Sequence, residues 1–382
     1  MTGPTQAGSE RRHVASWHCH AGDVSFVITA PARWLPAQRE YLSQFLPPPP
    51  RDLQLGSFSI RIHTGDRQFR QADAAATASP SARRIEPVPG LIMLESHQAT
   101  GRRCYSIAED AVEGLPGAYA TAVRHRRISI YLHSQTRRPH RYPIRILREA
   151  MLRTYEDAGG IIFHAAGIDV SGAGVMICGP AGAGKTTVAS ALLRHAGTTF
   201  LSGDRIVIIA GRRMVAVPLP VNAARGTIEA FGELRTILDR DAAGQDGASM
   251  LPADFGTRVK HSFTPSQFAG AFSAGFGSAS TLRLVVVPRL TDTAEPASLE
   301  RLRGNRARLA IAESCFTPRD EFWITPWITP RHSPDIALQR RADTFVDAIT
   351  AEVPCFRVCF GVRGPLGGLE GALKTMVEEI GS

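Results

Sequence analysis

Lysine is scarce in this chain of 382 residues: only three of its 44 basic residues are lysine, and the rest are arginine. A lysine ammonium group is a compact point charge, whereas the arginine guanidinium is a wide planar fork, so the two are not interchangeable in a tight site. The scarcity singles out Lys185, which lies in the motif described below, and Lys260, for which scarcity is the only indication. The third lysine is Lys374.

The chain also lacks any run of 18 or more apolar residues, and its first 13 residues have no apolar core of a signal peptide. A membrane-spanning helix needs about 20 apolar residues, so we expect no membrane partner. The six cysteines include no Cys-x2-Cys pair and indicate neither a disulfide framework nor a zinc knuckle. We therefore expect a cytoplasmic protein.

The formal net charge of +9 arises from arginines spread along the whole chain, with no binding motif of interleaved aromatic residues. Such a distribution favours a solvated basic surface, and we expect no nucleic-acid partner. The apolar fraction of 43% and the charged fraction of 21% are ordinary for a globular protein, and the length is sufficient for two domains.

The sequence pattern changes twice along the chain. Residues 1–13 are polar, and we predict them to be disordered. Residues 14–142 predict a small sheet-rich α/β domain, which could dock a substrate; within it, residues 71–84 are rich in Ala and Ser, lack large apolar residues, and predict an exposed loop. Strand patterns in this domain occur at 24–29, 58–63, 90–94, 103–107 and 127–132.

Residues 143–382 predict a second α/β domain, in which apolar spacing indicates a helix over 144–155. Tandem Trp-Ile-Thr-Pro units begin at Trp323 and Trp327, and we favour a core position for them over an exposed aromatic loop. Predicted strands are 161–167, 174–178, 282–287 and 356–362, with a hairpin formed by 205–210 and 213–217.

Residues 179–187 read Gly-Pro-Ala-Gly-Ala-Gly-Lys-Thr-Thr, between a predicted strand and a helix predicted over 186–194. This is the Walker A pattern, in which glycines turn backbone N–H groups toward phosphate oxygens, Lys185 bridges the terminal phosphates and Thr186 holds Mg²⁺. The alternative is a glycine-rich connection without a ligand. The residues predicted to bind the nucleotide are Gly179, Gly182, Ala183, Gly184, Lys185, Thr186 and Thr187.

The segment from His164 to Ile208 resembles the nucleotide-binding core of the HPr kinase/phosphorylase family. It carries a histidine on the strand before the Walker loop, an acidic residue at Asp169, and an Asp-Arg pair, Asp204-Arg205, after the strand that follows the Walker helix. The resemblance implies a P-loop nucleotide-binding core of the HPr kinase/phosphoenolpyruvate carboxykinase type, preceded by the smaller sheet-rich α/β domain. It also implies ATP and Mg²⁺ as cofactors, and association into a homo-oligomer rests on this resemblance alone.

The resemblance also suggests roles for individual side chains. Asp204 would bind Mg²⁺ or orient the acceptor hydroxyl, and His164 would belong to the same catalytic site. Arg205 and Arg225 would neutralise charge on the transferring phosphate. Structural alternatives stay open: Asp204 as a turn residue or helix cap, His164 as a core histidine, each arginine as a surface or structural residue, and Asp169 as a turn residue rather than an aid to Mg²⁺.

Two positions depart from the family pattern. Gly203 stands where the bifunctional enzymes have the first aspartate of a pair, and Val221–Gly226 occupies roughly the place of their Glu-Ile-Arg-Gly signature. We expect an ATP-dependent kinase acting on a serine or threonine hydroxyl of a protein or peptide, such as a natural-product precursor peptide. The alternatives are a kinase of a small hydroxylated metabolite, a non-catalytic ATP-binding module, which Gly203 favours, and a hydrolase that releases phosphate to water.

Overall fold

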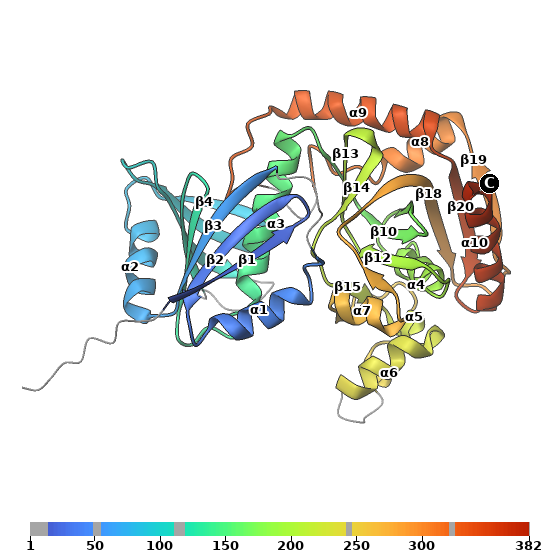
Figure 1. Cartoon of the computed structure of the whole chain (residues 1–382), viewed down its shortest axis with the longest axis horizontal. Coiled ribbons are helices and arrows are strands. Elements are labelled where there is room, and N and C mark those ends of the chain that lie inside the picture. The colour runs from blue at the N-terminus through green and yellow to red at the C-terminus, as the bar shows by residue number, and fades with distance from the viewer. Residues whose placement is uncertain (1–13, 49–54, 111–118, 242–246, 321–324, 382) are drawn as a thin grey trace, which may run out of the picture. The chain divides into compact units, whose positions relative to one another are not determined.

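The computed structural model describes residues 14–48, 55–110, 119–241, 247–320 and 325–381 and shows a mixed α/β fold (Figure 1). The described residues divide into two compact units. One comprises residues up to Cys19, Phe26–Leu42 and Ser57–Pro143, and the other comprises His20–Ser25, Ser43–Gly56 and Ile144 onward. Residues 1–13, for which we predict disorder, lie outside the described residues. Among the described helices, none is both long and apolar enough to span a membrane.

The first unit is built around an eight-stranded sheet in the order β1-β2-β3-β8-β7-β6-β5-β4. Strands β4 to β8 form an antiparallel series, whereas β3 and β8 run parallel. Its helices are α1 (Leu35–Ser43) and α2 (Asp66–Thr77). The strands are β1 (Val14–Ala21), β2 (Val24–Pro31), β3 (Gly56–His63), β4 (Arg83–Val88), β5 (Leu91–His97), β6 (Arg103–Asp110), β7 (Tyr119–Arg124) and β8 (Arg127–Leu132).

The predicted loop over residues 71–84 is wrong, because helix α2 continues to Thr77 and β4 begins at Arg83. Alanine has the highest helix propensity, and a run of it needs no large apolar residue to form a helix. Phe69, Ala72 and Ala76 form the buried side of α2 and pack against the strands β5 to β8. Small side chains here let the helix approach the sheet closely.

The second unit contains a ten-stranded sheet in the order β17-β12-β10-β11-β18-β14-β13-β9, with β20 paired to β18 and to β19. Its strands are β9 (Ile161–Phe163), β10 (Ala165–Val170), β11 (Ala173–Cys178), β12 (Thr198–Ser202), β13 (Ile206–Ile209), β14 (Arg213–Ala216), β17 (Gly275–Phe276), β18 (Ala279–Thr291), β19 (Ser298–Leu302) and β20 (Cys355–Gly361). A separate two-stranded sheet pairs β15 (Val221–Ala223) with β16 (His261–Phe263). Its helical segments are α3 (Arg141–Asp157), α4 (Lys185–Leu193), η1 (Ala210–Arg212), α5 (Arg225–Ala230), α6 (Gly232–Asp241), η2 (Gly247–Met250), α7 (Pro265–Ala271), α8 (Gly304–Ala312), α9 (Asp335–Glu352) and α10 (Leu366–Gly381).

Helices cover both faces of the central strand β11. Val175 and Ile177 belong to the apolar cluster that contains α4 and α10, whereas Met176 and Cys178 belong to the cluster that contains α8 and α9 (Figure 1). Side chains alternate between the two faces of a strand, so a strand buried on both faces reads as a continuous apolar run. The strand predicted over 174–178 is confirmed as β11, and it runs parallel to β18.

The strand predicted over 161–167 is divided at His164. Before it, β9 pairs with β13, and after it, β10 pairs with β11 and β12. The His164 N–H donates to the Ser314 carbonyl (2.7 Å) and the Ala165 N–H donates to the Asp204 carbonyl (3.1 Å). The chain thus changes its pairing strand at His164. This change holds His164 close to Asp204, which lies just after the end of β12.

The remaining predicted elements of the second unit agree with the structure. The helix over 144–155 and the strand over 282–287 fall within α3 and β18. The helix over 186–194, the hairpin and the strand over 356–362 correspond to α4, β13–β14 and β20, with ends that differ by one residue. Trp327 is buried in the core, as predicted. Trp323 lies outside the described residues.

Candidate functional site

The segment between β11 and α4 forms a glycine-rich loop whose last residue, Gly184, precedes the first residue of α4. Gly182 and Gly184 have φ of 84° and 101°, a region that favours glycine. Lys185 Nζ folds back over the loop and donates to the carbonyl oxygens of Gly179 (2.7 Å) and Pro180 (3.1 Å). The N-terminal N–H groups of a helix have no partner within it, so this end of α4 suits an anion.

The two glycines make a matched pair of substitutions. At Gly182 an added Cβ would meet no atom within 4 Å, whereas at Gly184 it would lie 2.8 Å from Phe360 Cζ. We expect Gly182→Ala to lower the free energy of unfolding by about 1–2 kcal/mol, through the left-handed backbone alone. Gly184→Ala should cost clearly more, because Phe360 must also move. Denaturant unfolding of both variants checks this, and equal losses would contradict the steric argument.

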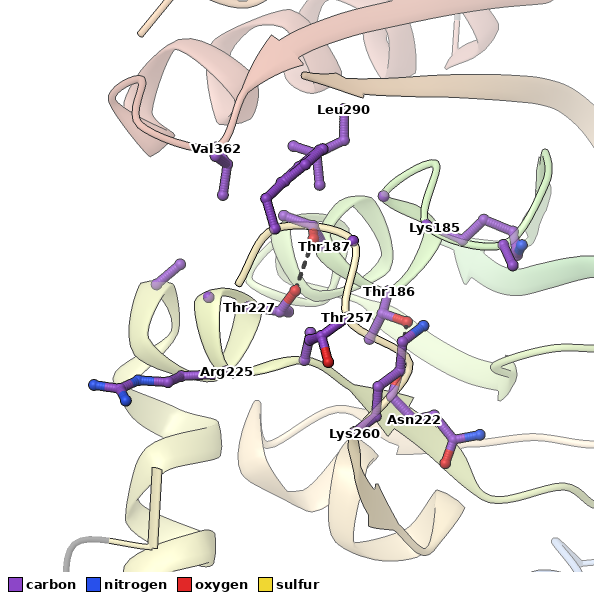
Figure 2. Close-up of a pocket in the computed structure, with 18 of the residues that line it drawn as sticks. Lys185, Thr186, Thr187, Asn222, Arg225, Thr227, Thr257, Lys260, Leu290 and Val362 are labelled. Atoms are coloured by element: carbon purple, nitrogen blue, oxygen red, sulfur yellow. Dashed lines mark hydrogen bonds between the residues drawn. The ribbon is translucent and has the colours of Figure 1, made fainter. Parts of the chain in front are cut away.

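A cavity of about 810 Å³ adjoins this loop. It brings together residues that are far apart in the sequence, among them His164, the glycine-rich loop and the α5 region. Figure 2 shows the loop side chains Lys185 and Thr186 and, from α5, Arg225. The predicted site residues that line it are His164, Gly182, Gly184, Lys185, Thr186, Thr187, Asp204 and Arg225. Gly179, Ala183 and Arg205 do not line it; Gly179 contributes its carbonyl oxygen to Lys185, and the Ala183 carbonyl accepts from Leu290 N–H (3.0 Å).

Asp204 is held by two side chains. His164 Nε2 lies 3.1 Å from its Oδ1, and the Arg205 guanidinium bonds Oδ2. Burial opposes the charged carboxylate, but the hydrogen bond from His164 and the charge of Arg205 outweigh it and lower the pKa of Asp204 to about 2. With 37% of its side chain exposed, Asp204 is therefore an ionised carboxylate in the cavity at any physiological pH.

Arg205 lies behind Asp204 rather than in the cavity wall. Its buried guanidinium bonds both carboxylate oxygens of Asp320 (3.2 Å each) and lies 4.5 Å from the centre of the Phe316 ring. That ring also stacks on His164, at 5.0 Å between centroids. Arg205 thus holds the Asp204 carboxylate from behind. This placement does not favour direct contact between Arg205 and a ligand in the cavity.

Arg225 lines the cavity from the start of α5. Its Nε donates to Glu229 Oε1 (2.7 Å), four residues along the helix. Near it, the hydroxyls of Thr187 and Thr227 are joined by a hydrogen bond of 3.0 Å (Figure 2). This bond links the first turn of α4 to α5, so Arg225 is positioned relative to the glycine-rich loop.

Lys185 is a cation in a confined place. Burial disfavours its charged form and, although Asp204 acts in the opposite direction, lowers its pKa to about 8. A polyanion beside the ammonium group would replace the solvation that the cavity removes. The loop and Lys185 together are therefore suited to bind phosphate groups.

Thr186 and Asp204 have the chemistry that Mg²⁺ requires. Mg²⁺ prefers oxygen ligands and often takes only one or two from the protein, with phosphates and water completing the shell. The Thr186 hydroxyl donates its hydrogen to the Asn222 carbonyl (3.1 Å), which leaves oxygen lone pairs free to bind a cation. Within the described residues, no cluster of three His, Cys, Asp or Glu could hold a metal alone. The donor set thus fits an ion that arrives with phosphate.

Asp169, considered as an aid to Mg²⁺, does not line the cavity. Its carboxylate accepts from Gly172 N–H (2.9 Å) and from the Ser280 hydroxyl, at the turn between β10 and β11. This arrangement supports the alternative of a turn residue.

Several cavity residues were not predicted from the sequence. Asp292 lines the cavity and forms an ion pair with Arg363 (2.9 Å). It follows the carboxyl end of β18, which runs parallel to β11, so both strands deliver their next residues to the same sheet edge. That topological signal could have found Asp292. Asn222 has no comparable signal, because only the fold brings it to Thr186.

Comparison with models of known protein families finds no match for this chain, and comparison with curated proteins finds none either. Its function is therefore inferred from the residues that the fold brings together.

Proposed function

We propose that this protein is an ATP-dependent kinase with a P-loop core, which transfers the γ-phosphate to a serine or threonine hydroxyl of a protein or peptide. One observation carries the proposal: Lys185, Thr186 and the His164–Asp204 pair line a single cavity. A phosphate-binding loop alone is compatible with many functions. A constrained, ionised carboxylate in the same cavity adds the group that a phosphoryl-transfer site needs beside its phosphates.

The proposed roles follow from where the side chains lie. The glycine-rich loop and Lys185 would hold the phosphates, and Thr186 and Asp204 would hold Mg²⁺. When bound, this ion supplies neutralisation of charge on the phosphate oxygens. In phosphoryl transfer the protein contributes mainly by positioning the reactants and stabilising charge. These contacts would therefore account for most of its catalytic contribution.

Asp204 is suited to orient the acceptor hydroxyl rather than to act as a general base that takes up its proton. In transfer, the hydroxyl oxygen bonds to the γ-phosphorus while the bond from that phosphorus to the bridging oxygen breaks, so that ADP leaves and the hydroxyl proton passes to solvent water. A carboxylate whose pKa is about 2 is a weak base at neutral pH but a good hydrogen-bond acceptor. Asp204 would accept the hydrogen bond of the acceptor hydroxyl, and His164 and Arg205 would fix its orientation.

The cavity wall favours a protein or peptide acceptor. Phe255 and Val362 both line the cavity, yet they are 48% and 40% exposed. Exposed apolar side chains at the edge of a site suit contact with another chain. The volume of about 810 Å³ lies within the range of small-molecule sites, about 300–1,000 Å³, so a nucleotide with a small metabolite is the second candidate.

A non-catalytic nucleotide-binding module is the candidate from another functional class. The observation that favours it is Gly203, which lines the cavity beside Asp204 without a side chain. An added Cβ there would lie 3.1 Å from Val221 Cγ2, so the neighbouring strand β15 leaves little room for a larger residue. In such a module, ATP would order an interface with a partner.

The test is transfer of label from γ-labelled ATP with Mg²⁺ to a panel of serine- and threonine-containing peptides and hydroxylated metabolites. Label on a peptide supports the proposal, and label on a metabolite supports the second candidate. Phosphate released without an acceptor indicates a hydrolase. Nucleotide binding with neither transfer nor release would reject the kinase in favour of the module.

A further inference from the structure

The cavity contains one more cation, whose surroundings differ from those of its neighbours. Arg225 is paired with Glu229, Arg363 with Asp292, and Lys185 donates to loop carbonyls. Lys260 also lines the cavity, but in the described part of the chain no carboxylate pairs with it. Of the chain's three lysines, two thus lie in one cavity, and among the described residues Lys260 has no carboxylate partner.

Lys260 is tied to the glycine-rich loop by the small β15–β16 sheet. It directly precedes β16, where Ser262 pairs with Asn222 of β15 and donates to the Asn222 Oδ1 (2.6 Å). The carbonyl of the same Asn222 accepts from the Thr186 hydroxyl. Figure 2 shows the Lys260 side chain reaching toward Thr186. The small sheet therefore fixes the position of the Lys260 backbone relative to the first turn of α4.

The side chains of Lys260 and Lys185 line the same cavity, so their positive charges act on each other. Two like charges in one cavity repel, and an anion with several oxygen atoms between them relieves the repulsion and binds to both. The distribution of charge therefore indicates a polyanion that extends from the glycine-rich loop toward β16.

We propose that Lys260 is a second phosphate-binding residue, which contacts the terminal phosphate of the nucleotide from the β15–β16 side of the cavity. The inference rests on the proposed nucleotide site and adds to it a residue outside the glycine-rich motif. An acidic group of the acceptor has similar anionic oxygen atoms. The experiment below separates these two sources.

The test is calorimetric binding of ATP, ADP and AMP, with Mg²⁺, to the full chain and to Lys260→Gln. A hydrogen bond to a charged group contributes about 1.5–3 kcal/mol, so ATP affinity should fall about 10- to 100-fold. ADP affinity should fall less and AMP affinity should stay the same. Lys260→Arg, which keeps the charge, should recover part of the ATP affinity. Lys374→Gln, which replaces an exposed lysine of α10 outside the cavity, is the matched control and should bind all three as the original chain does.

Unchanged ATP affinity in Lys260→Gln would overturn this proposal. If that variant instead requires more acceptor peptide for the same transfer rate, the amine serves the acceptor and the proposal is again wrong. Failure of the proposed function is a different result: the unmodified chain would then bind no ATP, and Lys185→Ala would change nothing. Thermal unfolding of each variant distinguishes a loss of ATP affinity from a loss of the folded state.

Discussion

Lys185→Ala should reduce phosphoryl transfer by at least about 10³-fold and weaken ATP binding in the same protein. Lys185 is 8% exposed, and the carbonyls of Gly179 and Pro180 direct its ammonium group across the loop. Lys185→Arg should also fail, because a planar guanidinium does not fit the place of a compact ammonium between two carbonyls.

The measurement for Lys185 is the initial rate of label transfer, with thermal unfolding to verify the fold. Lys374→Ala is a suitable control, since that lysine is 68% exposed on α10 and lies outside the cavity. Transfer by Lys185→Ala within tenfold of the original rate would remove the glycine-rich loop from the mechanism.

ATP affinity should depend on pH through the same lysine. Because the pKa of Lys185 is lowered to about 8, the ammonium group is largely charged at pH 7 and largely neutral at pH 9.5. A bound polyanion favours the charged form, so binding takes up a proton above pH 8 and the affinity falls as the pH rises through this range. Calorimetry between pH 7 and 9.5 measures the slope. Lys185→Ala should lose this contribution, and an identical slope in that variant would assign the dependence to another group.

Sequence patterns that depend on neighbouring residues predicted much of the second unit. The apolar run before the glycine-rich motif, the motif itself and the following helix fold as strand, loop and helix because each is specified within about 20 residues. The same reasoning failed at residues 71–84, where the absence of large apolar residues suggested a loop. Alanine stabilises a helix by its backbone preference alone, and the sheet beneath α2 supplies the apolar contact.

The composition of the cavity could be predicted only in part, because its walls come from distant segments. His164 and Asp204 meet because the chain changes strand partners at His164. Asp320, which anchors Arg205, is 115 residues away from it in the sequence. No local period or spacing encodes such a contact. Lys260 is intermediate: its scarcity as a lysine marked it, but its place in the cavity depends on the pairing of β15 with β16.

Asp204→Asn should reduce transfer about 10²- to 10⁴-fold while ATP affinity changes by less than tenfold. The amide keeps the shape of the side chain but loses the negative charge that would bind Mg²⁺ and orient the acceptor hydroxyl. The pKa of Asp204 is about 2, so between pH 5 and 9 this residue should contribute no titration to the rate. Rates at saturating ATP, together with calorimetric ATP affinity, measure the two effects separately.

Asp320→Asn is the matched control, because Asp320 bonds the same arginine from the side away from the cavity. Breaking a buried ion pair costs about 3–5 kcal/mol, so this variant should lose stability in denaturant unfolding and keep transfer within about tenfold per folded molecule. The two substitutions thus separate support of Arg205 from action on substrate. The outcome that would contradict a catalytic role has two parts. The original chain would show no phosphoryl transfer, and Asp204→Asn would keep both ATP binding and its effect on a partner. The protein would then be a non-catalytic nucleotide-binding module. A selective loss of transfer would instead show that the Asp204 charge acts on the reacting groups.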